Sequence, residues 1–198
     1  LQDPAEPPLP GELGKIYHQI GNCLVRLGNQ QEAIQAYINA TQDPDYGNIG
    51  SLNYNIGVSY ASLKDFENAA KFFGVAVTDE KYDSRYKAYT GLGTSLMKLG
   101  KGADAGVAFR EAALDESNPD PTKALLNLGV CFMSLDRPLD AVTSYESALH
   151  FDMDDDLKNK LHANLGQAYV ATGQMRKAVQ AFEECLKDGN YKLSDSAS

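Results

Sequence analysis

Residues 53–76 read NYNIGVSYASLKDFENAAKFFGVA, and this stretch holds the pattern that decides the fold. Gly57 is followed 12 residues later by Ala69 and 16 residues later by Phe73. Lys64 and Asp65 interrupt two runs of helical periodicity. The stretch therefore predicts two helices joined by a short turn. Small residues let the two helices approach closely, and the aromatic ring fills the space beside them.

The same pattern recurs along the whole chain of 198 residues. Successive copies of its glycine are 36, 36, 36 and 37 residues apart, and each glycine is followed by alanine after 12 residues and by an aromatic residue after 16. A pair of helices cannot bury its own apolar face, so such pairs must stack. The five glycines are Gly21, Gly57, Gly93, Gly129 and Gly166.

In every copy this pattern resembles the tetratricopeptide repeat family, over about residues 12–188. The resemblance implies an all-α fold, a right-handed α-solenoid in which five helix-turn-helix units form a superhelix. We expect a Pro-rich linker over residues 1–10, the repeat array over 11–188 and a polar tail over 189–198. The expected units cover about residues 14–47, 50–83, 86–119, 122–155 and 159–190.

Composition and charge narrow the classes of function. The formal net charge of −9 argues against nucleic-acid binding, which needs concentrated Lys and Arg. No apolar run approaches the roughly 18 residues of a membrane helix, so we expect no direct membrane insertion. The sequence leaves the location unknown. It favours the cytoplasm, with a tethered or exported domain as the alternative if further sequence precedes Leu1.

The residues form no recognisable catalytic or metal-binding constellation. The acidic run at residues 152–156 is similar to the start of a calcium loop, but Leu157 stands where the loop needs glycine. We therefore interpret the run as a helix cap. We predict no enzyme activity, no catalytic residue, no metal and no cofactor. Three cysteines without CxxC spacing, expected as buried, reduced thiols, are Cys23, Cys131 and Cys185.

One face of the first helix in each repeat points away from the predicted core. In the family that the chain resembles, this face lines a concave groove that holds peptides. Six positions in each of five repeats occupy it, and these thirty residues include no Asp or Glu, whereas a random set would hold about four. They sum to +6, while the rest of the chain carries −15. Such a groove would attract an acidic segment or a terminal carboxylate.

Lysine stands six residues before the glycine in four of the five repeats, and amides are frequent two residues before it. An amide there could bond a ligand backbone. The alternatives are that the amides bond water or a neighbouring helix and that the lysines form a solvated face. The predicted peptide-binding residues are Lys15, His18, Asn22, Tyr54, Asn55, Lys87, Lys98, Lys123, Asn127, Lys160 and Asn164.

Some members of the family hold the C-terminal carboxylate of heat-shock chaperones with two lysines, two asparagines and an arginine. Asn22, Asn55 and Lys87 match three of these places, but His18 replaces a lysine and Gly91 the arginine. The leading hypothesis is a protein-interaction scaffold whose groove binds an acidic or carboxylate-terminated peptide. The alternatives are a co-chaperone-like adaptor and a structural assembly module that self-associates through an uncovered terminal repeat.

Overall fold

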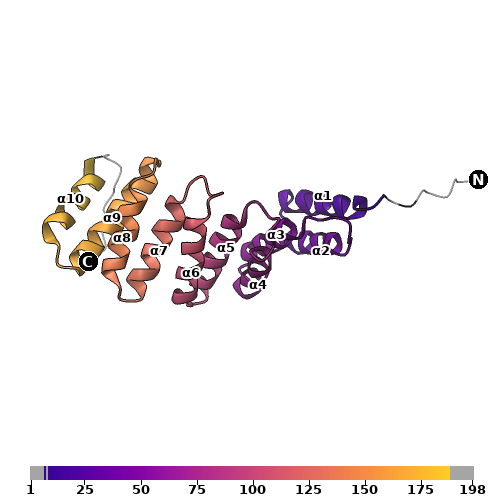
Figure 1. Ribbon diagram of the computed structural model, residues 1–198, viewed down its shortest axis with the longest axis horizontal. Helices are drawn as coiled ribbons and strands as arrows, with labels where there is room; N and C mark the ends of the chain where they lie inside the picture. Colours follow the sequence, from indigo (N-terminus) through magenta and orange to yellow (C-terminus); the bar gives the residue numbers. More distant parts are fainter. Residues whose placement is uncertain (1–6, 8, 188–198) are drawn as a thin grey trace, which may run out of the picture. The chain divides into compact units, whose positions relative to one another are not determined.

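The computed structural model describes residue 7 and residues 9–187, and within them the chain forms ten α-helices and no strand. The predicted all-α solenoid of helix-turn-helix repeats is confirmed (Figure 1). The helices belong to two compact units, Leu1–Lys101 and Gly102–Ser198, each considered by itself. The expected polar tail, residues 189–198, and residues 1–6 and 8 of the expected linker lie outside the described residues.

The first unit contains five helices that stack in chain order. The pairs α1 with α2 and α3 with α4 form hairpins, α2 packs on α3, and α4 packs on α5. The helices are α1 (Glu12–Arg26), α2 (Gln30–Thr41), α3 (Ile49–Ser62), α4 (Phe66–Ala76) and α5 (Arg85–Lys98).

The second unit repeats this arrangement. The pairs α7 with α8 and α9 with α10 form hairpins, α6 packs on α7, and α8 packs on α9. The helices are α6 (Gly102–Leu114), α7 (Thr122–Ser134), α8 (Pro138–Ala148), α9 (Asp155–Ala171) and α10 (Met175–Lys187).

Each turn between the two helices of a repeat contains one residue with a left-handed backbone, as at Lys64, where the helical periodicity is interrupted. Three of these residues are glycines, for example Gly28 with φ of 82°. The other two are Lys64 with φ of 61° and Asp136 with φ of 55°, although side chains disfavour this region. The turn geometry is therefore kept even where the residue is not glycine.

Four of the five pattern glycines are points of close helix contact inside one unit. A methyl group at Gly57 would lie 2.8 Å from ring carbons of Phe73, and one at Gly166 would lie 2.6 Å from the ring of Phe182. Gly21 and Gly129 are in the same relation to Tyr37 and Tyr145. The aromatic ring of the second helix thus occupies the space that a side chain at this glycine would need.

In the first two repeats, an aspartate and a tyrosine that follow the second helix contact the start of the first helix. The carboxylate of Asp43 accepts a hydrogen bond of 2.8 Å from the N–H of Gly14, and Asp79 accepts one of 2.7 Å from the N–H of Gly50. Each aspartate satisfies a backbone donor of the first turn of α1 or α3. Tyr82 then covers Gly50, where an added methyl group would lie 2.5 Å from the tyrosine Cβ.

We expect Gly57→Ala to lower the free energy of unfolding by about 1–3 kcal/mol, because the methyl group collides with the buried Phe73 ring. Gly74→Ala in α4 is the matched control: nothing lies within 4 Å of a methyl group there, so the helix should gain about 0.5 kcal/mol. Urea unfolding of both variants measures the difference. Equal effects would contradict the close-contact role of Gly57.

Candidate functional site

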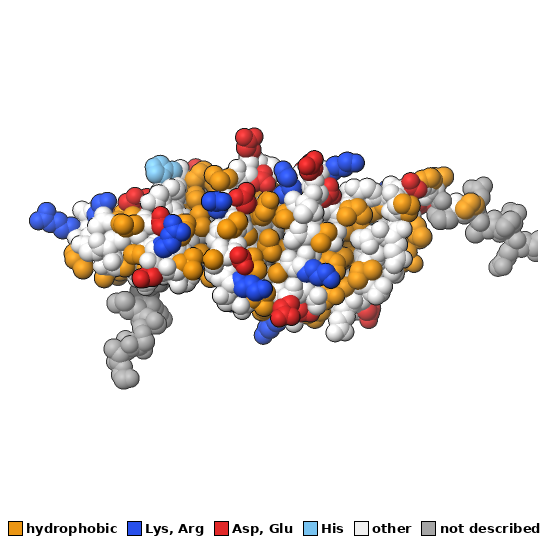
Figure 2. Space-filling model, turned by 60° about the horizontal axis from the view of Figure 1, so that its bottom comes forward, with side chains coloured by type: hydrophobic (Ala, Val, Ile, Leu, Met, Phe, Trp, Pro, Cys, Tyr) orange, Lys and Arg blue, Asp and Glu red, His pale blue; other side chains and the backbone are white. Residues whose placement is uncertain are grey.

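The predicted peptide-binding residues all lie on the first helices of the repeats. In the first unit, α1, α3 and α5 carry seven of them, and in the second unit α7 and α9 carry four. Side chains of Lys and Arg lie at the surface of both units (Figure 2). The first-unit residues are Lys15, His18, Asn22, Tyr54, Asn55, Lys87 and Lys98. The second-unit residues are Lys123, Asn127, Lys160 and Asn164.

All five predicted lysines are exposed. The ion pairs found among the described residues involve Arg110, Arg137 and Lys177, and none of them includes a predicted peptide-binding lysine. Lys87 has its Nζ atom 5.8 Å from the centroid of the Tyr86 ring, so this ammonium group also lies beside an aromatic surface. These ammonium groups are therefore accessible to an anionic ligand.

His18 connects three segments of the first unit. Its Nε2 atom lies 3.0 Å from the amide nitrogen of Asn55 on α3, and its Nδ1 atom lies 2.8 Å from the hydroxyl of Tyr46, which follows α2. Because the Asn55 amide donates to Nε2, the imidazole is neutral and its Nδ1–H donates to the tyrosine oxygen. Burial lowers the pKa of His18, in accord with a neutral ring. Both ring nitrogens are thus engaged inside the protein.

The asparagines of the two units differ in how their amides are used. Asn22 accepts a hydrogen bond of 2.9 Å from the hydroxyl of Tyr37, and Asn55 donates to His18. Among the described contacts, neither the Asn22 Nδ2 nor the Asn55 Oδ1 has a partner. Asn127 and Asn164, both partly buried, make no side-chain hydrogen bond within the described part of the second unit. Each of the four amides therefore keeps at least one group for a ligand backbone.

Phe73 explains why Gly91 stands where a chaperone-binding relative would need arginine. A methyl group on Gly91 would lie 2.6 Å from the Phe73 ring, which is almost completely buried. Any larger residue on α5 at this point would displace the ring from its position against Gly57. The neutral His18 removes a second cation of that arrangement.

A tyrosine cluster lies beside Lys87 in the first unit. The Tyr54 ring is centred 5.8 Å from Phe73 and 6.1 Å from Tyr82, and burial, with a smaller contribution from nearby Tyr86, raises the pKa of Tyr54. Sequence reasoning missed Tyr82. A signal existed, because Tyr46 and Tyr82 each stand 11 residues before a repeat glycine.

The expectation of three buried thiols is wrong for Cys23, which is exposed, whereas Cys131 and Cys185 are buried. No helix covers this side of α1 among the described residues, so position in the repeat alone did not determine burial. Burial raises the pKa of Cys131 to about 11.

Asp154 caps α9 by accepting a hydrogen bond of 2.8 Å from the N–H of Leu157, as predicted for the acidic run.

The described residues contain no group of three or more His, Cys, Asp or Glu side chains placed to hold a metal ion. None of their helices has the length and apolar character needed to cross a membrane.

Two family models, both described as tetratricopeptide repeat, match most of the chain. One matches residues 90–156, and the other matches residues 14–42, 50–77 and 160–187. No curated protein matches the chain.

Several solved structures share the fold. A crystal structure of MamA protein is 22% identical with a TM-score of 0.75, covering 92% of this chain and 98% of that one. MamA from Desulfovibrio magneticus RS-1 is 19% identical with a TM-score of 0.73, covering 92% and 100%. YrrB, described as a TPR protein with an unusual peptide-binding site, is 19% identical with a TM-score of 0.70, covering 86% and 84%.

We expect native stability to fall on acidification through the titration of His18. Its pKa is lowered on folding, so the unfolded chain binds the proton more readily. The stabilising contribution is therefore complete above the ordinary histidine pKa and is lost as pH falls through the folded-state pKa. Protonation of Nε2 also removes the acceptor for Asn55.

Urea unfolding between about pH 7.5 and pH 5 measures this effect. The wild-type midpoint should fall more steeply than that of His18→Gln, while the exposed His150→Gln control should follow the wild type. Parallel pH profiles for wild type and His18→Gln would show that the imidazole is not held neutral.

Proposed function

Because the chain belongs to the tetratricopeptide repeat family, whose members are protein-interaction scaffolds, we propose that it binds an acidic or carboxylate-terminated peptide segment. The segment lies on the peptide-binding face, which in each unit comprises the same six positions of every first helix. The observation that carries this proposal is a set of exposed lysines, outside the described ion pairs, on a face without Asp or Glu.

Charge orients the peptide and accelerates its encounter with the protein. The peptide-binding face sums to +6 in a chain of net −9, so the remaining surface repels the acidic ligand that the face attracts. A single exposed pair contributes little, typically about 0–1 kcal/mol. Several lysines acting together favour the encounter and its orientation more than they favour affinity.

Amides and apolar side chains between the lysines supply backbone bonds and contact area. Asn127 and Asn164 present amides without a described internal partner, and each can both donate to and accept from a peptide group. Tyr54 and Val58 in the first unit and the exposed Val170 in the second offer apolar contact. This combination fits an extended acidic segment with interspersed apolar residues. YrrB, a structural relative, is described as having a peptide-binding site, and a peptide is the class of ligand proposed for this chain.

The co-chaperone alternative receives less support. Gly91 is held against Phe73, and His18 is neutral and bonded on both ring nitrogens. Two of the five side chains that grip a chaperone carboxylate are therefore not cationic here. A single terminal carboxylate would meet Lys87 and the free Nδ2 donor of Asn22, but the free Oδ1 of Asn55 is an acceptor and would not bind it. This favours acidic segments of broader sequence.

Peptide binding should depend on lysines of the first helices. We expect the double variant Lys87→Glu with Lys123→Glu to bind acidic peptides at least about tenfold more weakly, because attraction becomes repulsion at two places. Fluorescence anisotropy with labelled acidic decapeptides, selected on a peptide array with free and amidated C-termini, measures the dissociation constants.

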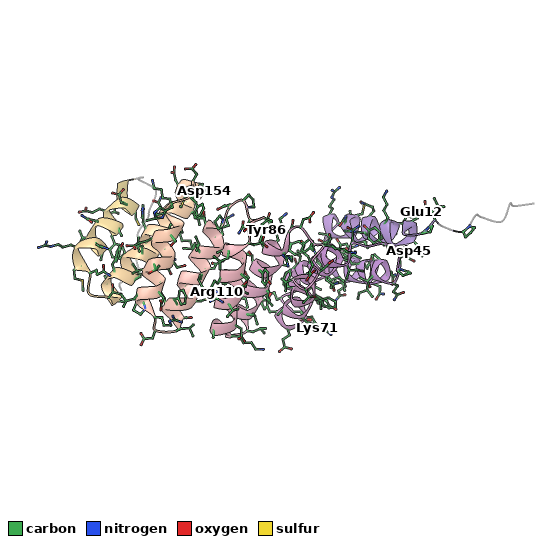
Figure 3. All side chains as sticks on the ribbon, viewed as in Figure 1. Glu12, Asp45, Lys71, Tyr86, Arg110 and Asp154 are labelled. Atoms are coloured by element: carbon green, nitrogen blue, oxygen red, sulfur yellow. The ribbon has the colours of Figure 1, made fainter. Side chains whose placement is uncertain are left out.

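The matched control reverses the same number of charges on second helices, in Lys71→Glu with Arg110→Glu (Figure 3). Both of these side chains are exposed, and the control has the same net charge as the test variant. The control should lose far less affinity. If both double variants lose affinity equally, only net charge matters. If the test variant binds as the wild type does, the peptide lies elsewhere.

A further inference from the structure

Two helix faces in the described part of the chain expose stripes of apolar side chains. Each stripe has spacings of three or four residues, which place its members on one side of a helix. The α1 face consists of Leu13, Ile16, Ile20, Cys23 and Leu27. The α10 face consists of Met175, Val179, Phe182 and Leu186.

Three positions of the α1 face, those of Ile16, Ile20 and Cys23, are buried in the second, fourth and fifth repeats, whereas the places of Leu13 and Leu27 stay exposed in the second repeat. Ile20 is 42% exposed, whereas Ile56, at the equivalent place one residue before its glycine, is 1% exposed and Leu165 is 3% exposed. Ile16 corresponds to the fully buried Leu52. In those repeats the first helix packs on the second helix of the preceding repeat, as α3 does on α2 and α9 on α8. The α1 face is therefore the first-helix half of a junction between repeats.

Two positions of the α10 face, those of Val179 and Phe182, are buried in the first and fourth repeats, whereas the place of Leu186 is exposed in the fourth. Val179 is 56% exposed, whereas Ile34 and Val142 at the equivalent place are 7% and 6% exposed. Phe182 is 38% exposed, whereas Tyr145 is 1% exposed. In those repeats the first helix of the next repeat packs on the second helix, as α9 does on α8. The α10 face is therefore the second-helix half of the same kind of junction.

We propose that a second copy of the chain covers these faces, with the α10 face of one copy packed on the α1 face of another. Inside each unit the second helix of one repeat packs on the first helix of the next, as α2 does on α3 and α8 on α9, and a second copy would supply the same contact. The α1 face also borders an open cavity of about 950 Å³, lined by Ile16, Ile20 and Cys23 together with Leu9 and Tyr46. Glu12 and Asp45 lie at this end of the first unit and also line the cavity (Figure 3).

This contact joins two different faces, so it is heterologous. A pair of copies leaves one α1 face and one α10 face uncovered, and association continues as the concentration rises unless a ring closes. The mode differs from a symmetric dimer, in which α1 would pack on α1 or α10 on α10. The proposed contact between the α10 face and the α1 face involves one predicted peptide-binding residue, Lys15, which lies at the margin of the cavity.

Two charge substitutions test the proposal through complementation. Ile20→Glu blocks the α1 face and leaves the α10 face intact, and Val179→Glu does the opposite. Because both side chains are exposed, the fold should survive, which circular dichroism checks. By sedimentation equilibrium of the 198-residue chain, each variant alone should be monomeric, while their equimolar mixture should form a 1:1 dimer and nothing larger. Val107→Glu on α6, 54% exposed in the wild type, is the control and should associate as the wild type does.

Cys23 provides a second readout that does not depend on a variant's folding. Its place in the repeat is taken by the buried Cys131 in α7, so a copy packed on α1 should shield it. Alkylation of Cys23 by iodoacetamide should slow at least about tenfold across the association range in the wild type and stay constant in Val179→Glu. Cys131 and Cys185 supply the rate of a buried thiol within the same sample.

Three results would overturn the proposal. A wild-type chain that stays monomeric up to about millimolar concentration has no such contact. Association of Ile20→Glu alone would indicate α10 packed on α10, and association of Val179→Glu alone would indicate α1 packed on α1. Protection of Cys23 at every concentration would mean that another segment of the same chain covers the α1 face.

Discussion

The contact between a glycine on the first helix and an aromatic ring on the second is the constraint on which the described repeats depend. Gly57 and Phe73 illustrate it, because the ring occupies the space that a side chain at Gly57 would need. The two helices therefore meet at this point, with the rotation of each helix about its own axis fixed. That rotation decides which residues of the first helix face outward. The same ring also lies against Gly91 of α5, so one side chain sets the packing of three helices.

The spacing of glycine, alanine and aromatic residues was enough to predict the helices and their pairing, because packing at these positions is local and recurs. The outward position of the lysines followed from the same spacing. The partners of the polar residues did not. His18 meets Tyr46 and Asn55, which are 28 and 37 residues away, and such contacts depend on side-chain rotamers that periodicity does not describe.

The spacing pattern also did not predict which side chains of the first repeat are buried. Cys23 and Cys131 occupy equivalent places, yet one is exposed and the other buried, because burial requires a helix from the preceding repeat. A sequence pattern defines what a position can pack against, whereas the neighbouring repeat decides whether it does. Tyr82 is the opposite case. Tyr46 and Tyr82 recur at the repeat period, but Tyr82 lies in a connection between helices, where helical periodicity assigns no buried face.

The left-handed turn residues at Lys64 and Asp136 have a consequence for how such a chain can vary. Each turn inside a repeat has one permitted length, since an inserted residue would rotate the second helix and move its ring away from the glycine. The single change of period, from 36 to 37 residues, occurs after α8 and accompanies the long helix α9 rather than a longer turn. Insertions that add new loops or epitopes are therefore tolerated between repeats, and the hairpins themselves are the parts that evolution or engineering must leave at constant length.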